Sequence, residues 1–168
     1  IELVHEKAKA GYALGYADPE YISVLPAFQM PFLSRDRKYR TFQISGDSMP
    51  PVSEGSWVTG EYVQNWQTIR DGQPYIIITK EDGIVFQVVY NQLKPTGGLL
   101  LCSTNPAYQP YEVPISEVFE VWKFVHFISH ELPEPNLTRD ELSRSVMDLR
   151  KEVGQLRMTM EKQGRLAL

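Results

Sequence analysis

The sequence contains a single cysteine, Cys102, among its 168 residues. One cysteine cannot form an internal disulfide, and free thiols fit a reducing compartment, so we expect a cytoplasmic protein. No apolar run approaches the roughly 20 residues that cross a bilayer, and the first residues lack the apolar stretch of a signal peptide. The composition therefore excludes a disulfide-stabilised secreted domain, and we expect no contact with a membrane.

Basic residues are outnumbered by acidic ones. The chain has 17 Lys and Arg against 21 Asp and Glu, which gives a net charge of −4. Domains that bind nucleic acids usually carry a basic patch that neutralises phosphates. The first residue is Ile1 rather than methionine, which indicates a fragment of a longer protein. We therefore expect any contact with DNA to come from a part of the protein outside this chain.

Several motifs of metal and cofactor sites are also missing. The sequence has no phosphate-binding glycine loop, no Cys-x-x-Cys pair and no His-Glu-x-x-His string. His126 and His130 are four residues apart, a spacing that suits a metal site only on a helix, and they fall at the end of a predicted strand. We expect no metal ion, no cofactor and no small-molecule ligand.

The residues that are present predict a mainly β fold. With 42% hydrophobic and 23% charged residues, the chain has the composition of a globular protein, and its length suits one domain plus an appendage. Short runs rich in β-branched and aromatic residues are separated by turn signals. These runs are Tyr39–Ser45, Ser56–Val63, Tyr75–Thr79, Ile84–Tyr90, Leu99–Cys102 and Glu120–Ile128. They predict a compact antiparallel β domain over residues 38–130, whereas residues 1–37 show no sustained period and are interpreted as an arm and linker.

The pair Asp82-Gly83 is the strongest hairpin signal in the chain. A two-residue turn at this pair would place Ile78 opposite Gln87. Lys80 and Gln87 would then project from the same face of the sheet, roughly 7 Å apart along the strand.

The period of the apolar residues changes in the last part of the chain, residues 131–168. A linker over 131–137 is followed by a capping box, Thr138–Glu141, whose side chains satisfy free backbone N–H groups at a helix start. Beyond it, apolar residues form a heptad repeat with valine or methionine at a and leucine at d. These residues are Leu142, Val146, Leu149, Val153, Leu156 and Met160. The pattern favours a parallel two-stranded coiled coil, so we expect a homodimer.

The alternative is that this apolar stripe packs on the chain's own β domain. A helix that faces a core usually has a wider stripe, which extends to the e or g positions. Here those positions are polar, and they include Glu152 and Arg157, which are placed for an interhelical ion pair. The narrow apolar stripe from Leu142 to Met160, called the seam below, favours packing against a partner helix.

The most informative motif surrounds Ser48, where residues 46–51 read Gly-Asp-Ser-Met-Pro-Pro. The chain also carries the pair Ala10-Gly11 upstream and Asn-Pro-Ala-Tyr at 105–108 downstream. Together these residues resemble the self-cleaving serine–lysine proteases of the LexA and phage repressor type. The resemblance implies a LexA- or signal-peptidase-like β fold in which Ser48 is the nucleophile and Ala10-Gly11 is the cleavage site.

The sequence departs from the family pattern at the catalytic base. The family places a lysine followed by an arginine on a later strand, where this chain has Gln87 and Val88. A serine hydroxyl needs a base to take its proton, and a glutamine amide cannot accept it. Lys80 is a substitute base in the predicted hairpin, but beside a turn its amine is expected to be solvated and charged, which disqualifies it.

The resemblance implies a regulator whose N-terminal helix-turn-helix domain binds DNA and is absent from this chain. We therefore predict the C-terminal regulatory and dimerisation portion of a transcriptional regulator, without self-cleavage. Two other functions remain open: an active protease that cuts Ala10-Gly11, and a scaffold that presents a coiled coil. We also expect the residues around Ala10-Gly11 to lie extended across the β domain, close to Ser48.

Overall fold

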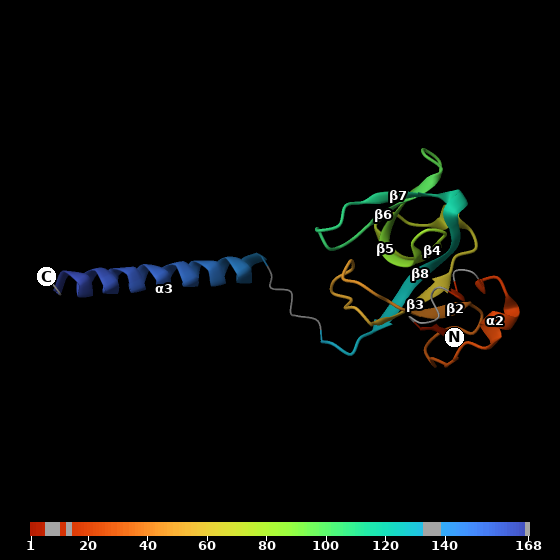
Figure 1. Cartoon of the computed structure of the whole chain (residues 1–168), viewed down its shortest axis with the longest axis horizontal. Helices are drawn as coiled ribbons and strands as arrows, with labels where there is room; N and C mark the ends of the chain where they lie inside the picture. The colour runs from red at the N-terminus through yellow and green to blue at the C-terminus, as the bar shows by residue number, and fades with distance from the viewer. Residues whose placement is uncertain (6–10, 13–14, 133–138, 167–168) are drawn as a thin grey trace. The chain divides into compact units, whose positions relative to one another are not determined.

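The computed structural model describes residues 1–5, 11–12, 15–132 and 139–166. The chain divides into two units, Ile1–Pro133 and Glu134–Leu168. Figure 1 shows the first unit as a β domain and the second as a helix. Ala10 and Thr138 lie outside the described residues.

The first unit is built on one sheet of eight strands, in the order β1-β2-β3-β8-β4-β5-β6-β7. The strands are β1 (Glu2–Val4), β2 (Tyr39–Gln43), β3 (Trp57–Tyr62), β4 (Gln73–Thr79), β5 (Gly83–Gln92), β6 (Gly98–Cys102), β7 (Tyr111–Pro114) and β8 (Val118–Ile128). Two short 3-10 helices, η2 (Trp66–Thr68) and η3 (Ile115–Glu117), lie in the connections. Neighbouring strands are antiparallel, except for the parallel pair β1 and β2. The prediction of a mainly β fold is confirmed.

All six predicted strands are present, and their bounds differ from the prediction by no more than two residues at either end. The strands β1 and β7 were not predicted. They have three and four residues, and segments this short do not show an alternating period. Both lie at the edges of the sheet, where pairing on one side alone fixes them.

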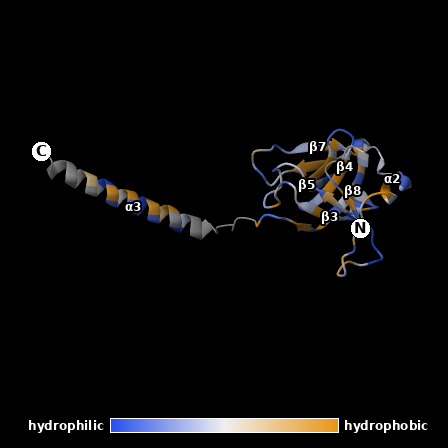
Figure 2. Cartoon of the chain, turned by 60° about the horizontal axis from the view of Figure 1, so that its bottom comes forward, coloured by the Kyte–Doolittle hydropathy of each residue, from blue (hydrophilic) through white to orange (hydrophobic). Residues whose placement is uncertain are grey.

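Hydrophobic residues cover both faces of the sheet. In β4, Ile76 and Ile78 belong to one core cluster, whereas Tyr75 and Ile77 belong to the other. Successive side chains of a strand point to opposite faces, so a strand buried on both faces reads as a continuous apolar run. Figure 2 shows hydrophobic residues concentrated in the strands of this unit. Because both faces of the central strand β4 are covered by a core cluster, β4 carries no charged residue between Tyr75 and Ile78.

The described residues of the N-terminal segment pack on the sheet. β1 pairs with β2 through Leu3, which lies opposite Thr41. The short helix α2 (Pro19–Ser23) begins where the Asp18 side chain accepts a hydrogen bond from a backbone N–H in the first turn at 2.9 Å. Tyr12 is fully buried. The predicted arm therefore belongs to the same compact unit as the sheet.

A buried polar cluster joins the N-terminal segment to the sheet. The Tyr12 hydroxyl donates a hydrogen bond to Glu120 Oε2 and accepts one from Arg40 Nη1. Glu120 Oε2 also accepts a hydrogen bond from Trp122 Nε1 at 3.0 Å, and Arg40 Nε donates to Glu2 Oε2 at 3.3 Å. Arg40 and Glu120 are only 1% and 5% exposed. Both buried ions are thus paired and hydrogen-bonded, as a low-dielectric interior requires.

The cluster predicts a loss of stability at alkaline pH. Burial and the nearby charge of Glu120 raise the pKa of Tyr12 above its usual value. A tyrosine with a raised folded-state pKa contributes stability that is fully present below about pH 10 and is lost as the pH rises further. We therefore expect the free energy of unfolding to fall above about pH 10 in the wild type, and less steeply in Tyr12→Phe. Urea denaturation at about pH 8, 10 and 11 measures both slopes.

A second tyrosine contributes to the same slope in both proteins. Burial and Asp82 raise the pKa of Tyr111 to about 12. Because Tyr111 is present in the wild type and in Tyr12→Phe, the difference between the two slopes isolates Tyr12. Equal losses of stability in the two proteins would contradict this interpretation of the cluster.

The second unit consists of α3 (Arg139–Leu166), which begins directly after Thr138, where the capping box predicts a helix start. The described seam residues Val146, Leu149, Val153, Leu156 and Met160 are between 46% and 71% exposed in this unit. The side chain of Leu142 lies outside the described part of the chain. Among the described residues, no helix is both long enough and apolar enough to cross a membrane. The C-terminal helix is therefore confirmed, and its partner helix stays a prediction.

Candidate functional site

Ser48 lies on the loop 44–56, which joins β2 to β3. Two apolar side chains of this loop, Met49 and Val52, enter the core and are 6% and 8% exposed. Gly46 has a φ of 84°, in the left-handed region that favours glycine. The buried side chains of Met49 and Val52 and the turn at Gly46 hold Ser48 half-buried at the surface of the β domain.

The motif at 105–108 holds this loop in place. The backbone N–H of Asn105 donates to Ser48 O at 3.1 Å, and its Nδ2 donates to Asp47 O at 3.1 Å. The Tyr108 hydroxyl donates to Asp47 Oδ1 at 2.5 Å, and this hydrogen bond to a carboxylate raises the pKa of Tyr108. The sequence identified the motif as part of the resemblance but did not predict that it clamps the Ser48 loop.

Gln87 lies on β5 and is 6% exposed. Its Oε1 accepts a hydrogen bond from Ser103 Oγ at 3.1 Å. The next residue, Thr104, donates from Oγ1 to Pro50 O in the Ser48 loop at 2.8 Å. The segment after β6 therefore contacts both Gln87 and the Ser48 loop, and within the described residues no side chain is hydrogen-bonded to the Ser48 hydroxyl.

Lys80 does not lie beside Gln87, and the predicted hairpin register is wrong. Thr79 pairs with Gly83, so the turn has three residues rather than two. The residue opposite Gln87 is Tyr75. Thr79 Oγ1 accepts a backbone hydrogen bond within the turn at 3.0 Å, and Gly83 has a φ of 69°, both of which stabilise the longer turn. Lys80 is exposed in this turn and lies roughly 16 Å along the strand from Tyr75.

Gly11 packs against α2 rather than beside Ser48. A Cβ atom on Gly11 would lie 3.0 Å from Tyr21 Oη, so the backbone at Gly11 lies close against this side chain of α2. Figure 1 shows α2 and the loop 44–56 at opposite ends of β2 and β3. The structure therefore does not bring Gly11 and Ser48 together. The burial of Tyr12 explains the difference, because it fixes the residue next to Gly11 on Arg40 and Glu120.

His126 and His130 lie in different surroundings. His126 packs edge-on against Phe32, with ring centroids 5.8 Å apart, and burial lowers its pKa. The His130 side chain is 67% exposed. In the part of the chain that the structure describes, no group of three His, Cys, Asp or Glu residues could hold a metal ion.

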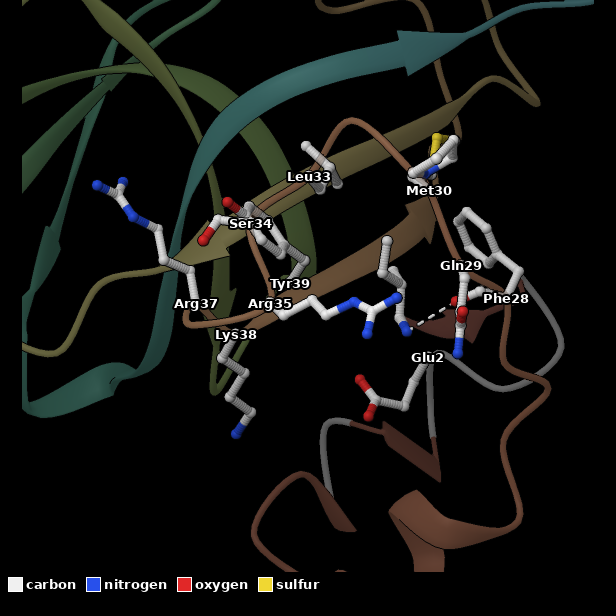
Figure 3. Close-up of a pocket in the computed structure, with 12 residues that line it drawn as sticks. Glu2, Phe28, Gln29, Met30, Leu33, Ser34, Arg35, Arg37, Lys38 and Tyr39 are labelled. Atoms are coloured by element: carbon white, nitrogen blue, oxygen red, sulfur yellow. Dashed lines mark hydrogen bonds between the residues drawn. The ribbon is translucent and has the colours of Figure 1, made fainter.

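A cavity of about 680 Å³ lies between the start of the chain and residues 28–39. Figure 3 shows Arg35 extending along it, while the amino group of Ile1 is hydrogen-bonded to Phe28 O at 2.9 Å. Neither Ser48 nor Gln87 lines this cavity. The cavity is therefore not part of the candidate site around Ser48.

The comparison with protein families agrees with this geometry. The Peptidase S24-like family model matches residues 2–125, a range that contains Ser48 and Gln87 and ends within β8, before α3. A comparison with curated proteins finds no match. The family match and the mainly β sheet confirm the resemblance to LexA-like peptidase domains. The chain belongs to the Peptidase S24-like family.

Proposed function

We propose that this chain is the regulatory and dimerisation portion of a helix-turn-helix transcriptional regulator, with a peptidase-like site that does not cut the chain. The family match and the Ser48 loop support the relationship to repressors. The net charge of −4 supports DNA binding through a domain outside this chain.

The proposed loss of cleavage rests on one observation, the buried and neutral side chain of Gln87. Its amide oxygen is hydrogen-bonded to Ser103, and an amide cannot take the proton of Ser48 at physiological pH. The loss of a general base costs on the order of 10²–10⁴ in rate. Lys80 does not replace it, because its exposed side chain lies in the turn between β4 and β5, whereas Gln87 pairs with Tyr75 farther along the hairpin.

The proposal predicts that the Ala10-Gly11 bond survives long incubation at about pH 9–10, where a lysine base would be increasingly neutral and cleavage fastest. Intact mass spectrometry measures the fragment that begins at Gly11. The matched control is Ser48→Ala, which removes the nucleophile. Accumulation of this fragment in the wild type, together with its absence in Ser48→Ala, would favour the active protease instead.

Restoring a base at position 87 also tests whether its absence prevents cleavage. We expect Gln87→Lys to raise cleavage at Ala10-Gly11 above the Ser48→Ala background, because a lysine in this apolar setting is held partly neutral. The control is Gln87→Met, which fills the position without supplying a base. Val88, which also departs from the family pattern, is kept in both variants.

The seam of α3 supports the dimerisation part of the proposal. Its exposed valine and leucine residues have no packing partner within the described unit, and a second copy of the same helix is complementary to them. In a parallel pair, Glu152 at g faces Arg157 at e of the partner helix. In an antiparallel pair, Arg150 and Arg157 at e would face each other, so their charges favour the parallel arrangement.

The same seam also suits the remaining alternative, a scaffold that only presents a coiled coil. The two functions differ in what precedes Ile1. A helix-turn-helix domain encoded upstream supports the regulator, whereas its absence from the full-length gene favours the scaffold.

A further inference from the structure

The cavity between the start of the chain and residues 28–39 has the size of a ligand pocket. Its volume is about 680 Å³, and pockets that hold small molecules usually measure about 300–1,000 Å³. Two backbone hydrogen bonds join its walls at one end: Phe28 N–H donates to Ile1 O at 3.0 Å, and the Ile1 nitrogen donates to Phe28 O at 2.9 Å. The cavity is therefore part of the folded β domain rather than a gap beside a loose segment.

The lining combines apolar side chains with a few polar groups, as small-molecule pockets usually do. The polar groups include the hydroxyl of Ser34 and the guanidinium of Arg35. The apolar residues of the segment are Phe28, Met30, Pro31 and Leu33. They favour a ligand with an apolar body, because binding removes that body from water.

A basic run borders the cavity, although the chain as a whole has a net charge of −4. Residues 35–40 read Arg-Asp-Arg-Lys-Tyr-Arg. Arg37 and Arg40 are paired with glutamates, and the ammonium of Lys38 lies over aromatic rings. Within the residues that the structure describes, the exposed side chain of Arg35 has neither an ion pair nor a hydrogen bond. Arg35 is therefore the cation that is available to a ligand.

The charges around the cavity favour an anion. Of the described residues that line it, three are basic, and Glu2 alone is acidic. Glu2 Oε2 accepts a hydrogen bond from Arg40 Nε at 3.3 Å, so its charge is already balanced by an arginine outside the lining. Figure 3 shows the Arg35 side chain extending along the cavity, whereas Lys38 points in a different direction.

We propose that this cavity binds an amphipathic carboxylate, a ligand whose acid group pairs with Arg35 and whose apolar body lies against residues 28–33. A guanidinium can donate two parallel hydrogen bonds to a carboxylate, which fixes the orientation of the ligand as well as its charge. The sequence did not predict a ligand, because the two walls of the cavity are separated in the chain by α2. The site contains neither Ser48 nor Gln87, so its failure would leave the proposed function standing.

Phenylbutyrate, a carboxylate on a short apolar chain, tests the site in the whole chain. We expect saturable binding by calorimetry, with NMR shift changes concentrated in the amides of residues 28–39. Phenylbutanamide has the same size without the charge and should bind about tenfold more weakly, because it loses the charge-assisted hydrogen bonds. Absence of saturable binding, or equal affinity for the acid and the amide, would overturn the proposal.

Substitutions of Arg35 test its role as the partner of the acid group. We expect Arg35→Gln to weaken phenylbutyrate binding about tenfold and to leave the affinity for the amide nearly unchanged. Arg35→Glu should instead prefer phenylbutylamine, because the charge at the site is reversed. The matched control is Arg70→Gln, which removes another exposed arginine, one that lines a different surface hollow. Wild-type affinity for phenylbutyrate in a folded Arg35→Gln would contradict the assignment.

A free acid and the C-terminus of a peptide share this chemistry, and a peptide probe distinguishes them. Acetyl-Gly-Gly-Phe carries its terminal carboxylate beside an apolar ring. Tighter binding than that of phenylbutyrate would identify the ligand as a peptide C-terminus, whereas weaker binding would identify a free acid. Both sources require Arg35, so the tighter probe should lose about tenfold in affinity in Arg35→Gln.

Discussion

Replacement of Glu120 by alanine is expected to lower the free energy of unfolding of the β domain by about 3–5 kcal/mol. The substitution leaves Arg40, which is 1% exposed, without its buried partner, and it also removes the acceptor of the Tyr12 hydroxyl and of Trp122 Nε1. Glu2 still accepts a hydrogen bond from Arg40 at 3.3 Å, which places the loss toward the lower end of this range. Guanidinium denaturation at neutral pH measures it.

The surface of the same sheet supplies a matched control. Glu61 accepts two hydrogen bonds from Arg37, whose side chain is 61% exposed. Exposed ion pairs contribute little because water already solvates both charges, so Glu61→Ala should change stability only slightly. A loss in Glu120→Ala no larger than that in Glu61→Ala would show that the buried cluster does not hold the domain together.

The double substitution Leu149→Asp and Leu156→Asp should convert a dimer to a monomer. Each aspartate would place a charge in the seam of a coiled coil, and a two-fold arrangement doubles the effect. We expect the dissociation constant to rise more than about 100-fold, equivalent to about 2.8 kcal/mol. Sedimentation near micromolar concentration measures it. Met147→Asp is the matched control, because Met147 is 71% exposed and occupies a b position outside the seam.

The same measurement on the wild type tests whether the proposed dimer forms at all. About three heptads are marginal for a coiled coil in isolation, so we expect the β domain to support pairing by raising the local concentration of the second helix. A wild-type chain that is already monomeric at this concentration would contradict the heptad interpretation.

The sequence predicted the strands well because each is a short apolar run bounded by turn residues. It failed on the register of the hairpin between β4 and β5. Asp82-Gly83 favours a two-residue turn locally, but β4 also pairs with β8, where Thr79 lies opposite Val118. Tertiary pairing and the hydrogen bond to Thr79 outweigh the local preference, and the three-residue turn removes Lys80 from the neighbourhood of Gln87.

The candidate site was predictable in part. The motif around Ser48 is local, so its residues could be read directly, and the buried position of Gln87 follows from the apolar run of β5. The Tyr12 cluster was not predictable. Arg40 and Glu120 look like ordinary polar residues in their strands, and they are 80 residues apart in the chain. Only the pairing of β3 with both β2 and β8 brings them to one point.

The neutral amide at position 87 also bears on how readily this site could regain activity over evolutionary time. A lysine at a position that is 6% exposed must lose its hydration, which destabilises the fold when the amine is charged. Gln87 avoids that penalty and satisfies the hydroxyl of Ser103. Under the proposed function, selection for stability alone would therefore oppose the return of the base. Cleavage would therefore be lost more easily than it is regained.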